Sequence, residues 1–219
     1  LDPPNAPTST FSAILAVSTV VLLRDEIEGD VSSWSIVNHA SLTGGGWVQA
    51  NPNGTVFGGE IAAPEDDATQ AADKVMAFVT GNGPVGGAAV DSDVDGGPTQ
   101  LISPTFDLVG TDATISYSRW FFCDNEGTPQ ADALVVEVSN NGGGSYTPVH
   151  TVTGTNSLWE TASFQVGDYV APTTQIVVRF RVADTGNNSV TEAGIDNFQV
   201  EALSCVLCKI DVECDDANP

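Results

Sequence analysis

The sequence is poor in positive charge. Its 219 residues include only 6 Lys and Arg against 29 Asp and Glu, which gives a formal net charge of -23 at pH 7. Proteins that bind nucleic acid or anionic membrane surfaces draw much of their affinity from basic side chains. The composition therefore argues against DNA, RNA and anionic lipid as partners. The carboxylates need either solvation in a salty medium or neutralisation by bound cations such as Ca²⁺.

Helix formers and long apolar runs are also scarce. The chain has a single Met and only two Lys, so a helical protein is not expected. The apolar stretch 11–23 is too short to span a membrane as a helix and follows Pro3, Pro4 and Pro7. No transmembrane segment is therefore expected. Because the chain starts at Leu1 without a cationic segment ahead of an apolar one, we interpret it as a processed piece of a longer exported protein.

Short runs of β-branched and aromatic residues alternate with turn residues from residue 24 to 203. The run 133–139 leads into the Gly-rich loop 140–144, which predicts a hairpin. Arg179 and Arg181 alternate with Val178 and Phe180, a pattern typical of an antiparallel strand with one exposed face. Regular short strands without helices predict an all-β, two-sheet antiparallel sandwich. We expect strands near residues 34–38, 46–50, 75–80, 100–102, 105–109, 113–122, 132–139, 145–152, 158–166, 175–183 and 194–202.

The segment 9–23 is rich in β-branched residues and contains no charge, Gly or Pro. Such a segment favours a strand that is covered on both faces. Two alternatives follow: an ordinary first strand of the domain's own sheet, or an N-terminal arm, residues 1–23, donated to the sheet of a neighbouring copy. In the second case the subunit contacts would be made by Phe11, Ile14, Leu15, Val17 and Val20.

Six short sequence segments, in this order along the chain, resemble segments of jelly-roll modules of the MAM and cleaved-adhesin superfamily. They are Asp25–Gly29 with Trp34, Pro64–Asp67, Asp93–Gly97, Ser116–Trp120, Val138–Gly143 and Ala193–Val200. The resemblance covers residues 22–202 and implies a concanavalin-like or galactose-binding-like jelly roll at 24–203. It implies adhesion, glycan contact or an accessory role beside a secreted enzyme. The tail 204–219 resembles short Cys-rich acidic repeats of bacterial surface proteins.

Two groups of acidic residues are candidate Ca²⁺ ligands, because Ca²⁺ prefers carboxylate and carbonyl oxygens. Asp25, Glu26 and Glu28 are expected on the opening strand, and the resemblance implies that they meet Asp196 on the neighbouring closing strand. The alternative is a solvated acidic edge that discourages sheet association.

The second group begins like a calcium loop, with Asp91, Asp93 and Asp95 followed by Gly96. Its twelfth position is Ile102 rather than the bidentate Glu of an EF-hand, so it is not an EF-hand. A looser site that includes residues 65–67 and a plain turn both remain open.

Aromatic side chains are candidates for a glycan site, because sugar rings stack on exposed aromatic faces. Trp47, Tyr146 and Trp159 are the candidates, whereas Trp34 and Trp120 are expected in the core. Catalysis is not expected. The two histidines, His39 and His150, lie in no nucleophile motif, and no phosphate-binding loop is present.

The four cysteines are Cys123, Cys205, Cys208 and Cys214, three of them within the last fifteen residues. Clustered Cys in an acidic, turn-rich chain favours disulfides and an oxidising, extracellular location. The sequence leaves their pairing open. It predicts a non-catalytic extracellular module, either a Ca²⁺-bound subunit of a fibre or surface assembly that contacts copies of itself or other surface proteins, or a carbohydrate-binding accessory module.

Overall fold

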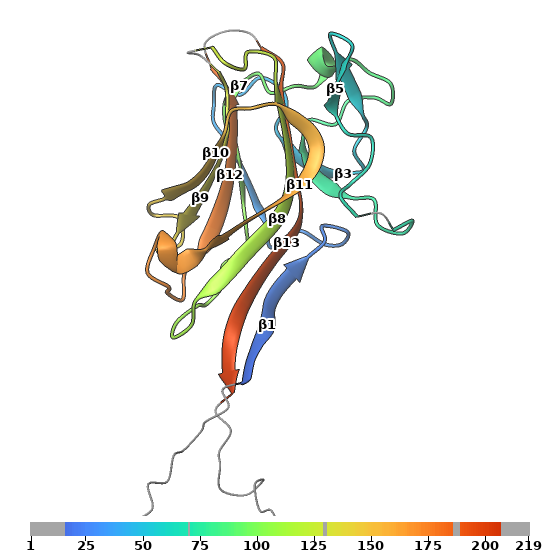
Figure 1. Ribbon diagram of the computed structural model, residues 1–219. Coiled ribbons are helices and arrows are strands. Elements are labelled where there is room, and N and C mark those ends of the chain that lie inside the picture. Colours follow the sequence, from blue (N-terminus) through green and yellow to red (C-terminus); the bar gives the residue numbers. More distant parts are fainter. Residues whose placement is uncertain (1–15, 70, 129–130, 186–188, 207–219) are drawn as a thin grey trace, which may run out of the picture.

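The structure is a computed structural model that describes residues 16–206, except residues 70, 129–130 and 186–188. Two antiparallel sheets face each other and form a jelly-roll sandwich (Figure 1). The described residues contain no α-helix, only the 3-10 turns η1 (Ala89–Asp91) and η2 (Val166–Asp168). No helical segment among them is long and apolar enough to cross a membrane. The predicted all-β, two-sheet fold is confirmed.

The larger sheet, here called the β13 sheet, has the order β11-β8-β13-β6-β3, with β1 as an additional partner of β13. Its strands are β1 (Ala16–Asp25), β3 (Trp47–Ala50), β6 (Ala77–Thr80), β8 (Ala113–Cys123), β11 (Asn156–Gln165) and β13 (Thr191–Val206). The second sheet, here called the β12 sheet, has the order β10-β9-β12-β7-β2. It contains β2 (Ser35–Asn38), β7 (Gly96–Ile102), β9 (Leu134–Ser139), β10 (Thr147–Val152) and β12 (Val177–Asp184).

Strand β13 connects the parts of its sheet. One edge pairs with β8 along residues 191–202, while the other edge pairs with β6 at 194–195 and with β1 at 198–206. β1 and β13 therefore continue together as a two-stranded ribbon beyond the sandwich (Figure 1).

This ribbon contains part of the N-terminal segment. Val17 and Val20 lie on β1, which pairs with β13 of the same chain. The predicted boundary after residue 23 falls inside β1. Phe11, Ile14 and Leu15 lie outside the described residues.

The core lies between the two sheets, as the alternation of apolar residues requires. Val178 and Phe180 are fully buried, and the intervening Arg179 and Arg181 lie on the outer face, as predicted. Trp34 packs against Phe78 and Phe198, with ring centroids 5.2 Å apart in both pairs. Large aromatic side chains bury the most apolar area per residue, so this cluster contributes strongly to stability.

One expected strand is absent, and one hairpin was not predicted. Residues 105–109 form no strand: only Phe106 makes an isolated bridge, to Ile176, because Pro104 lacks an N–H and the Asp107 carboxylate accepts the N–H of Val109. The small hairpin of β4 (Thr55–Phe57) and β5 (Glu60–Ala63) was missed. Its signal is the Gly58–Gly59 pair, whose φ values of 61° and 93° permit a tight two-residue turn.

Candidate functional site

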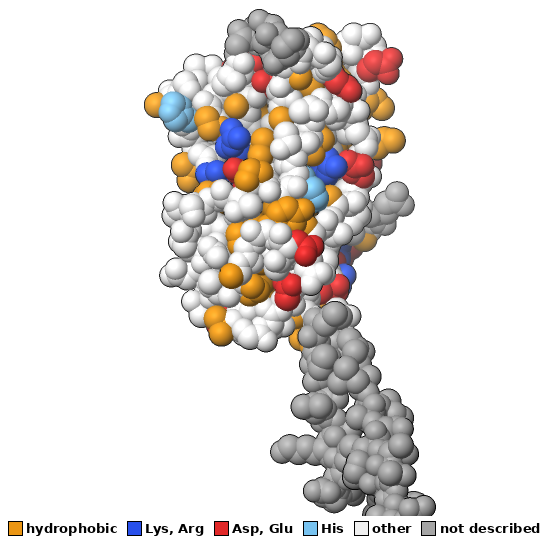
Figure 2. All heavy atoms as spheres, turned by 60° about the vertical axis from the view of Figure 1, so that its left-hand side comes forward, with side chains coloured by type: hydrophobic (Ala, Val, Ile, Leu, Met, Phe, Trp, Pro, Cys, Tyr) orange, Lys and Arg blue, Asp and Glu red, His pale blue; other side chains and the backbone are white. Residues whose placement is uncertain are grey.

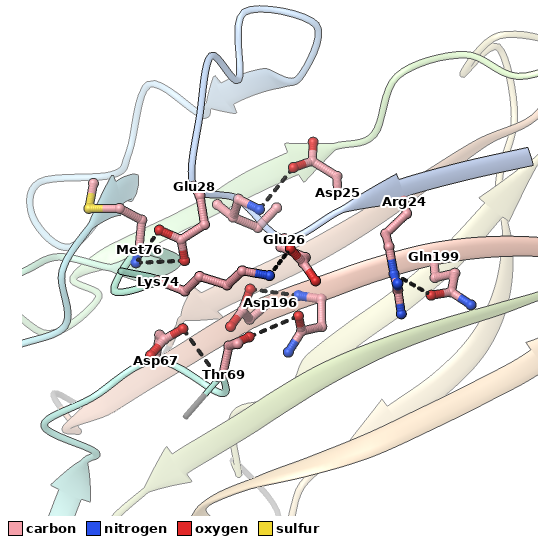
Figure 3. Close-up of polar contacts among 12 residues, drawn as sticks. Arg24, Asp25, Glu26, Glu28, Asp67, Thr69, Lys74, Met76, Asp196 and Gln199 are labelled. Atoms are coloured by element: carbon pink, nitrogen blue, oxygen red, sulfur yellow. Dashed lines mark hydrogen bonds and ion pairs between the residues drawn. The ribbon is translucent and has the colours of Figure 1, made fainter. Parts of the chain in front are cut away.

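An acidic cluster lies where the chain leaves β1 and approaches β13 (Figure 3). The carboxylate of Glu28 accepts a hydrogen bond from the backbone N–H of Val75 at 3.0 Å. Asp196 on β13 is fully buried, and its Oδ2 accepts the N–H of Ala68 at 3.0 Å. The structure thus places Glu28 and Asp196, which the sequence predicted to share a site, within electrostatic range of each other.

Asp67 joins this cluster from the loop after β5. It is nearly buried, and its Oδ2 accepts the N–H of Thr69 at 3.1 Å. Burial raises the pKa of Asp67, and the negative charges of Glu28 and Asp66 raise it further. Burial also raises the pKa of Asp196 to about 7, with Asp67 and Glu28 adding to the shift. Burial and the neighbouring carboxylates therefore both disfavour the charged forms of Asp67 and Asp196.

The two other predicted ligands beside β1 already have donors from the protein. Glu26 forms an ion pair with Lys74, the only Lys of the described residues. Asp25 accepts the backbone N–H of Ile27 and the indole N–H of Trp34, both at 2.8 Å. In Figure 3 the Asp25 carboxylate points away from Asp67 and Asp196. Asp25 thus stabilises the turn after β1 and fixes a core tryptophan.

The backbone around the cluster is held in an uncommon conformation. Ile27 and Asn197 are the two non-glycine residues with positive φ in the described ranges, at 61° and 50°. Such a conformation costs roughly 1–3 kcal/mol per residue and persists only where the surroundings enforce it. The Gln49 amide provides one such restraint by donating to the carbonyl oxygens of Ile27 and Gly29. Asn197 lies at a bulge in β13 that directs Asp196 into the cluster.

The donor set of this cluster is entirely oxygen, which fits a hard cation such as Ca²⁺. No group of three or more His, Cys, Asp or Glu residues within the described ranges is arranged to hold a metal ion as it stands. An ion here would therefore need backbone carbonyls and water beside Glu28, Asp67 and Asp196. The calcium expectation stays a prediction.

The Asp91–Asp95 run does not form one loop around a common centre. The Asp91 carboxylate accepts the N–H of Ala88 at 3.1 Å and caps η1. Asp93 and Asp95 instead line a pocket of about 420 Å³ together with Asp124, which the sequence did not single out. Asp124 lies near Asp93 and Asp95 because β8 pairs with β13, and no local sequence pattern indicates this pairing.

The three candidate sugar-binding aromatics have different environments. Trp47 is only 4% exposed and belongs to the core, so its assignment to a glycan site was wrong. Tyr146 is partly exposed beside the β12 sheet, with the Arg179 guanidinium 3.6 Å above its ring. Arg179 and Arg181 both contact Glu137. On the face drawn in Figure 2, the few basic side chains lie close to acidic ones. Trp34 and Trp120 are buried, as predicted.

Trp159 borders a groove between the β4–β5 hairpin and β11. Its indole N–H donates to the carbonyl oxygen of Asp66 at 2.8 Å, and its ring meets Trp120 edge to face at 6.3 Å. The groove measures about 410 Å³. Its apolar residues Val56, Ile61 and Leu158 are more than half exposed. The two contacts fix the orientation of Trp159.

The cysteine expectation requires one correction. Cys123 has a free, buried thiol, which lies 3.7 Å from the carbonyl oxygen of Thr153. The reason is its place at the end of β8, where its side chain points into the core. Cys205 lies on the ribbon formed by β13 and β1, but its side chain is not described. Cys208 and Cys214 lie outside the described residues.

Comparisons with known proteins bear on the fold. Neither a protein-family model nor a curated protein sequence matches the chain. The K3 cleaved adhesin domain of Lys-gingipain from Porphyromonas gingivalis W83 is similar in structure, with a TM-score of 0.50 and 14% sequence identity. That match covers 84% of this chain and 99% of the adhesin domain.

Two other solved structures are similar at lower scores. The K1 cleaved adhesin domain of the same gingipain has a TM-score of 0.49 and 17% identity, covering 84% of this chain and 97% of that domain. The family 11 carbohydrate-binding module from Clostridium thermocellum, solved with a mixed-linked tetrasaccharide, has a TM-score of 0.45 and 13% identity. It covers 86% of this chain and 96% of that module. The predicted resemblance is confirmed for the fold: this chain has the jelly-roll architecture of the cleaved-adhesin domains.

Proposed function

We propose that this chain is a non-catalytic adhesive module of an extracellular surface protein, which associates with a second copy of itself through the outer edge of β1. One observation carries the proposal. Val20, Val21 and Leu22 are consecutive on β1 and are 42%, 49% and 43% exposed. β1 pairs with β13 along one edge, and no strand in the described ranges pairs with its other edge.

An unpaired strand edge offers a row of N–H and C=O groups to another chain. Proteins that remain monomeric usually protect such edges with charges, Pro or bulges that face solvent. Residues 19–23 contain no charge and no Pro, although the edge belongs to a highly acidic protein. Pairing of β1 with β1 of a second copy would satisfy these backbone groups and remove the three apolar side chains from water.

The environments of the histidines support a non-catalytic module. His150 Nδ1 lies 2.7 Å from the Tyr117 hydroxyl between the sheets, and burial lowers the pKa of His150. His39 Nδ1 lies 2.7 Å from the Ser41 hydroxyl, which donates to the carbonyl oxygen of Gly97. A hydrolytic triad needs a carboxylate that orients the histidine, and neither ring has one among the described residues.

The acidic cluster beside β1 complements this proposal. A Ca²⁺ ion held by Glu28, Asp67 and Asp196 would neutralise buried charge at the base of the ribbon and tie the turn after β1 to β13. The ion would then stabilise the strand whose edge makes the contact. Its role here is structural, and no chemical step requires it.

Sedimentation velocity of the full chain over a range of concentrations tests the assembly. We expect wild type to associate as its concentration rises, and Val21→Lys to remain monomeric because two charged edges repel each other. Val85→Lys is the matched control, because Val85 is 77% exposed in the loop between β6 and η1 and is not part of β1; it should associate like wild type. A monomeric wild type at all concentrations, or an unchanged Val21→Lys, would refute the proposal.

A second candidate function, glycan binding, is favoured by the environment of Trp159. Its ring is held by Trp120 and Asp66 at the wall of a groove that also presents the Glu65 and Asp66 side chains. Apolar floors with a few fixed polar groups are typical of sugar sites. On a glycan array, Trp159→Ala should lose the signal of wild type and Tyr146→Ala should keep it. No glycan signal from wild type would eliminate this candidate.

A further inference from the structure

The outer face of the β12 sheet carries one row of side chains that crosses four neighbouring strands. Gln100 on β7 lies opposite Arg181 on β12. Val37 on β2 lies opposite Gln100, and Val135 on β9 lies opposite Arg181. Neighbouring strands are about 4.8 Å apart, so the row extends roughly 14 Å across the sheet. It places two polar side chains between two apolar ones on one surface.

Arg179, two residues before Arg181 on β12, is held by its neighbours. Its Nε donates to Glu137 Oε2 at 2.8 Å, and its Nη2 lies 2.7 Å from the same oxygen. Its Nη1 donates to Gln100 Oε1 at 2.9 Å, and the guanidinium lies 3.6 Å from the centre of the Tyr146 ring. Glu137 is only 7% exposed and needs such a partner. Arg179 is therefore a structural part of this face.

Arg181, by contrast, has unused hydrogen-bond donors. Its only partner within the described residues is Glu137, whose Oε2 lies 3.6 Å from Nε, too far for a hydrogen bond. The Arg181 side chain is 36% exposed, so its two outer nitrogens are open to a ligand. Because Gln100 Oε1 faces Arg179, the Gln100 NH2 group is a second donor, and it bonds to no described residue.

These donors carry a local excess of positive charge. Arg179 and Arg181 share the single carboxylate of Glu137, and no other described carboxylate forms an ion pair with either guanidinium. The three side chains together therefore have one net positive charge, in a protein whose formal charge is -23. A ligand with one carboxylate is attracted at this point, whereas an extended polyanion is repelled by the rest of the surface.

The strands at the centre of this face offer no backbone groups to a ligand. β7, β12 and β9 each pair with a strand on both edges, so a peptide cannot add to them as another strand. Val37 is 45% exposed and Val135 is partly exposed, so apolar surface flanks the donors. Apolar surface around a few fixed polar groups suits the C–H groups and oxygens of a sugar ring. The face therefore favours an acidic sugar over an acidic peptide.

We propose that Arg181 and Gln100 bind the carboxylate of a single acidic sugar at the end of a glycan. The two outer nitrogens of the Arg181 guanidinium donate to the carboxylate, and the Gln100 amide donates to a carboxylate or hydroxyl oxygen. Val37 and Val135 pack against the sugar ring. The site does not depend on the β1 edge or on the Trp159 groove, because the β4–β5 hairpin lies on the other side of the β13 sheet (Figure 1).

Calorimetric titration of the full chain tests the site with two probes that each end in one acidic sugar, sialyllactose and a disaccharide ending in glucuronic acid. Arg181→Gln should weaken binding at least about tenfold, as expected for loss of charge-assisted hydrogen bonds. Gln100→Glu should abolish binding, because it keeps an acceptor for Arg179 but replaces the free donor with a negative charge. Arg24→Gln is the matched control: it removes the same charge from β1 and should bind like wild type.

Two further measurements separate this site from other effects. Urea denaturation of Arg181→Gln should match wild type, because Arg179 still pairs with Glu137. Trp159→Ala and Val21→Lys should bind the acidic probe like wild type, so failure of the groove or of association is recognised separately. The inference is overturned if wild type binds neither acidic probe, if Arg181→Gln binds unchanged, or if lactose or a triglutamate peptide binds as tightly as sialyllactose.

Discussion

The indole of Trp120 on β8 lies directly against Gly194 on β13. The two residues are cross-strand partners, and a Cβ at position 194 would come 2.0 Å from Trp120 Nε1. The absence of a side chain at 194 thus lets Trp120 lie across β13. From that position it meets Trp159 at the wall of the groove.

We therefore expect Gly194→Ala to lower the free energy of unfolding by about 1–3 kcal/mol, the usual cost of overpacking a close-packed interior. Urea denaturation measures the change. Gly29→Ala is the control, because a Cβ at position 29 would meet no atom within 4 Å, and it should stay within about 0.5 kcal/mol of wild type. Equal stability of the two variants would show that the Trp120 side chain can move to accommodate the new methyl group at little cost.

Glu192 predicts a pH dependence of stability. Burial raises its pKa to about 7 from the usual 4.5, although the Thr55 hydroxyl opposes the shift. The folded state therefore binds a proton more tightly than the unfolded state does. The resulting stabilisation is fully present below pH 4.5 and is lost as the pH rises to about 7.

Denaturant titrations of wild type and Glu192→Gln, carried out in chelator at several pH values, test the direction of this pH dependence. The Gln variant should lack this part of the pH dependence and be more stable than wild type at pH 8. The difference between the two proteins is the relevant quantity, because Asp93 shifts in the same direction. A Gln variant that is less stable than wild type at pH 8 would contradict the assignment.

Cys123 should be unreactive in the folded protein. Its thiol is buried, and burial raises its pKa to about 11, so very little thiolate is present at neutral pH. We expect iodoacetamide to leave Cys123 unmodified until denaturant is added, as read by peptide mass spectrometry. Rapid labelling under native conditions would show that this end of β8 opens readily.

The cluster beside β1 predicts different roles for two nearby glutamates. Glu28→Gln should reduce the Ca²⁺-dependent rise in melting temperature, whereas Glu26→Gln should not, because Glu26 is paired with Lys74. At roughly 100 times its Kd, one bound ion contributes about 2.7 kcal/mol. Differential scanning calorimetry with and without chelator measures this. An equal loss in both variants would place Glu26 among the ligands.

Much of the fold could be predicted from local patterns. The alternation around Arg179 and Arg181 identified β12 and its outer face, and the Gly-rich loop 140–144 identified the β9–β10 hairpin. The same approach failed at residues 105–109, where apolar residues suggested a strand but Pro104 and Asp107 limit the pairing to a single bridge at Phe106. Trp47 was misassigned because composition does not reveal which sheet face a short strand buries.

The candidate sites were only partly predictable, for a related reason. Glu28 and Asp196 were expected together. Asp67 and Asp124, by contrast, lie in loops, and the path of a loop cannot be predicted from the periodicity of apolar side chains. Asp91 appeared equivalent to Asp93 and Asp95 in the sequence. The 3-10 turn η1 separates it from them by directing its carboxylate to the N–H of Ala88.

Charge and pattern alone determined that this protein is acidic, all-β and built from short antiparallel strands, because side-chain alternation and turn residues act over a few neighbouring positions. Tertiary structure decided that the first strand pairs with the last one, that one edge of it stays open within the described ranges, and which carboxylates share a pocket. These features depend on contacts between residues far apart in the chain, and only the packing of the two sheets brings those residues together.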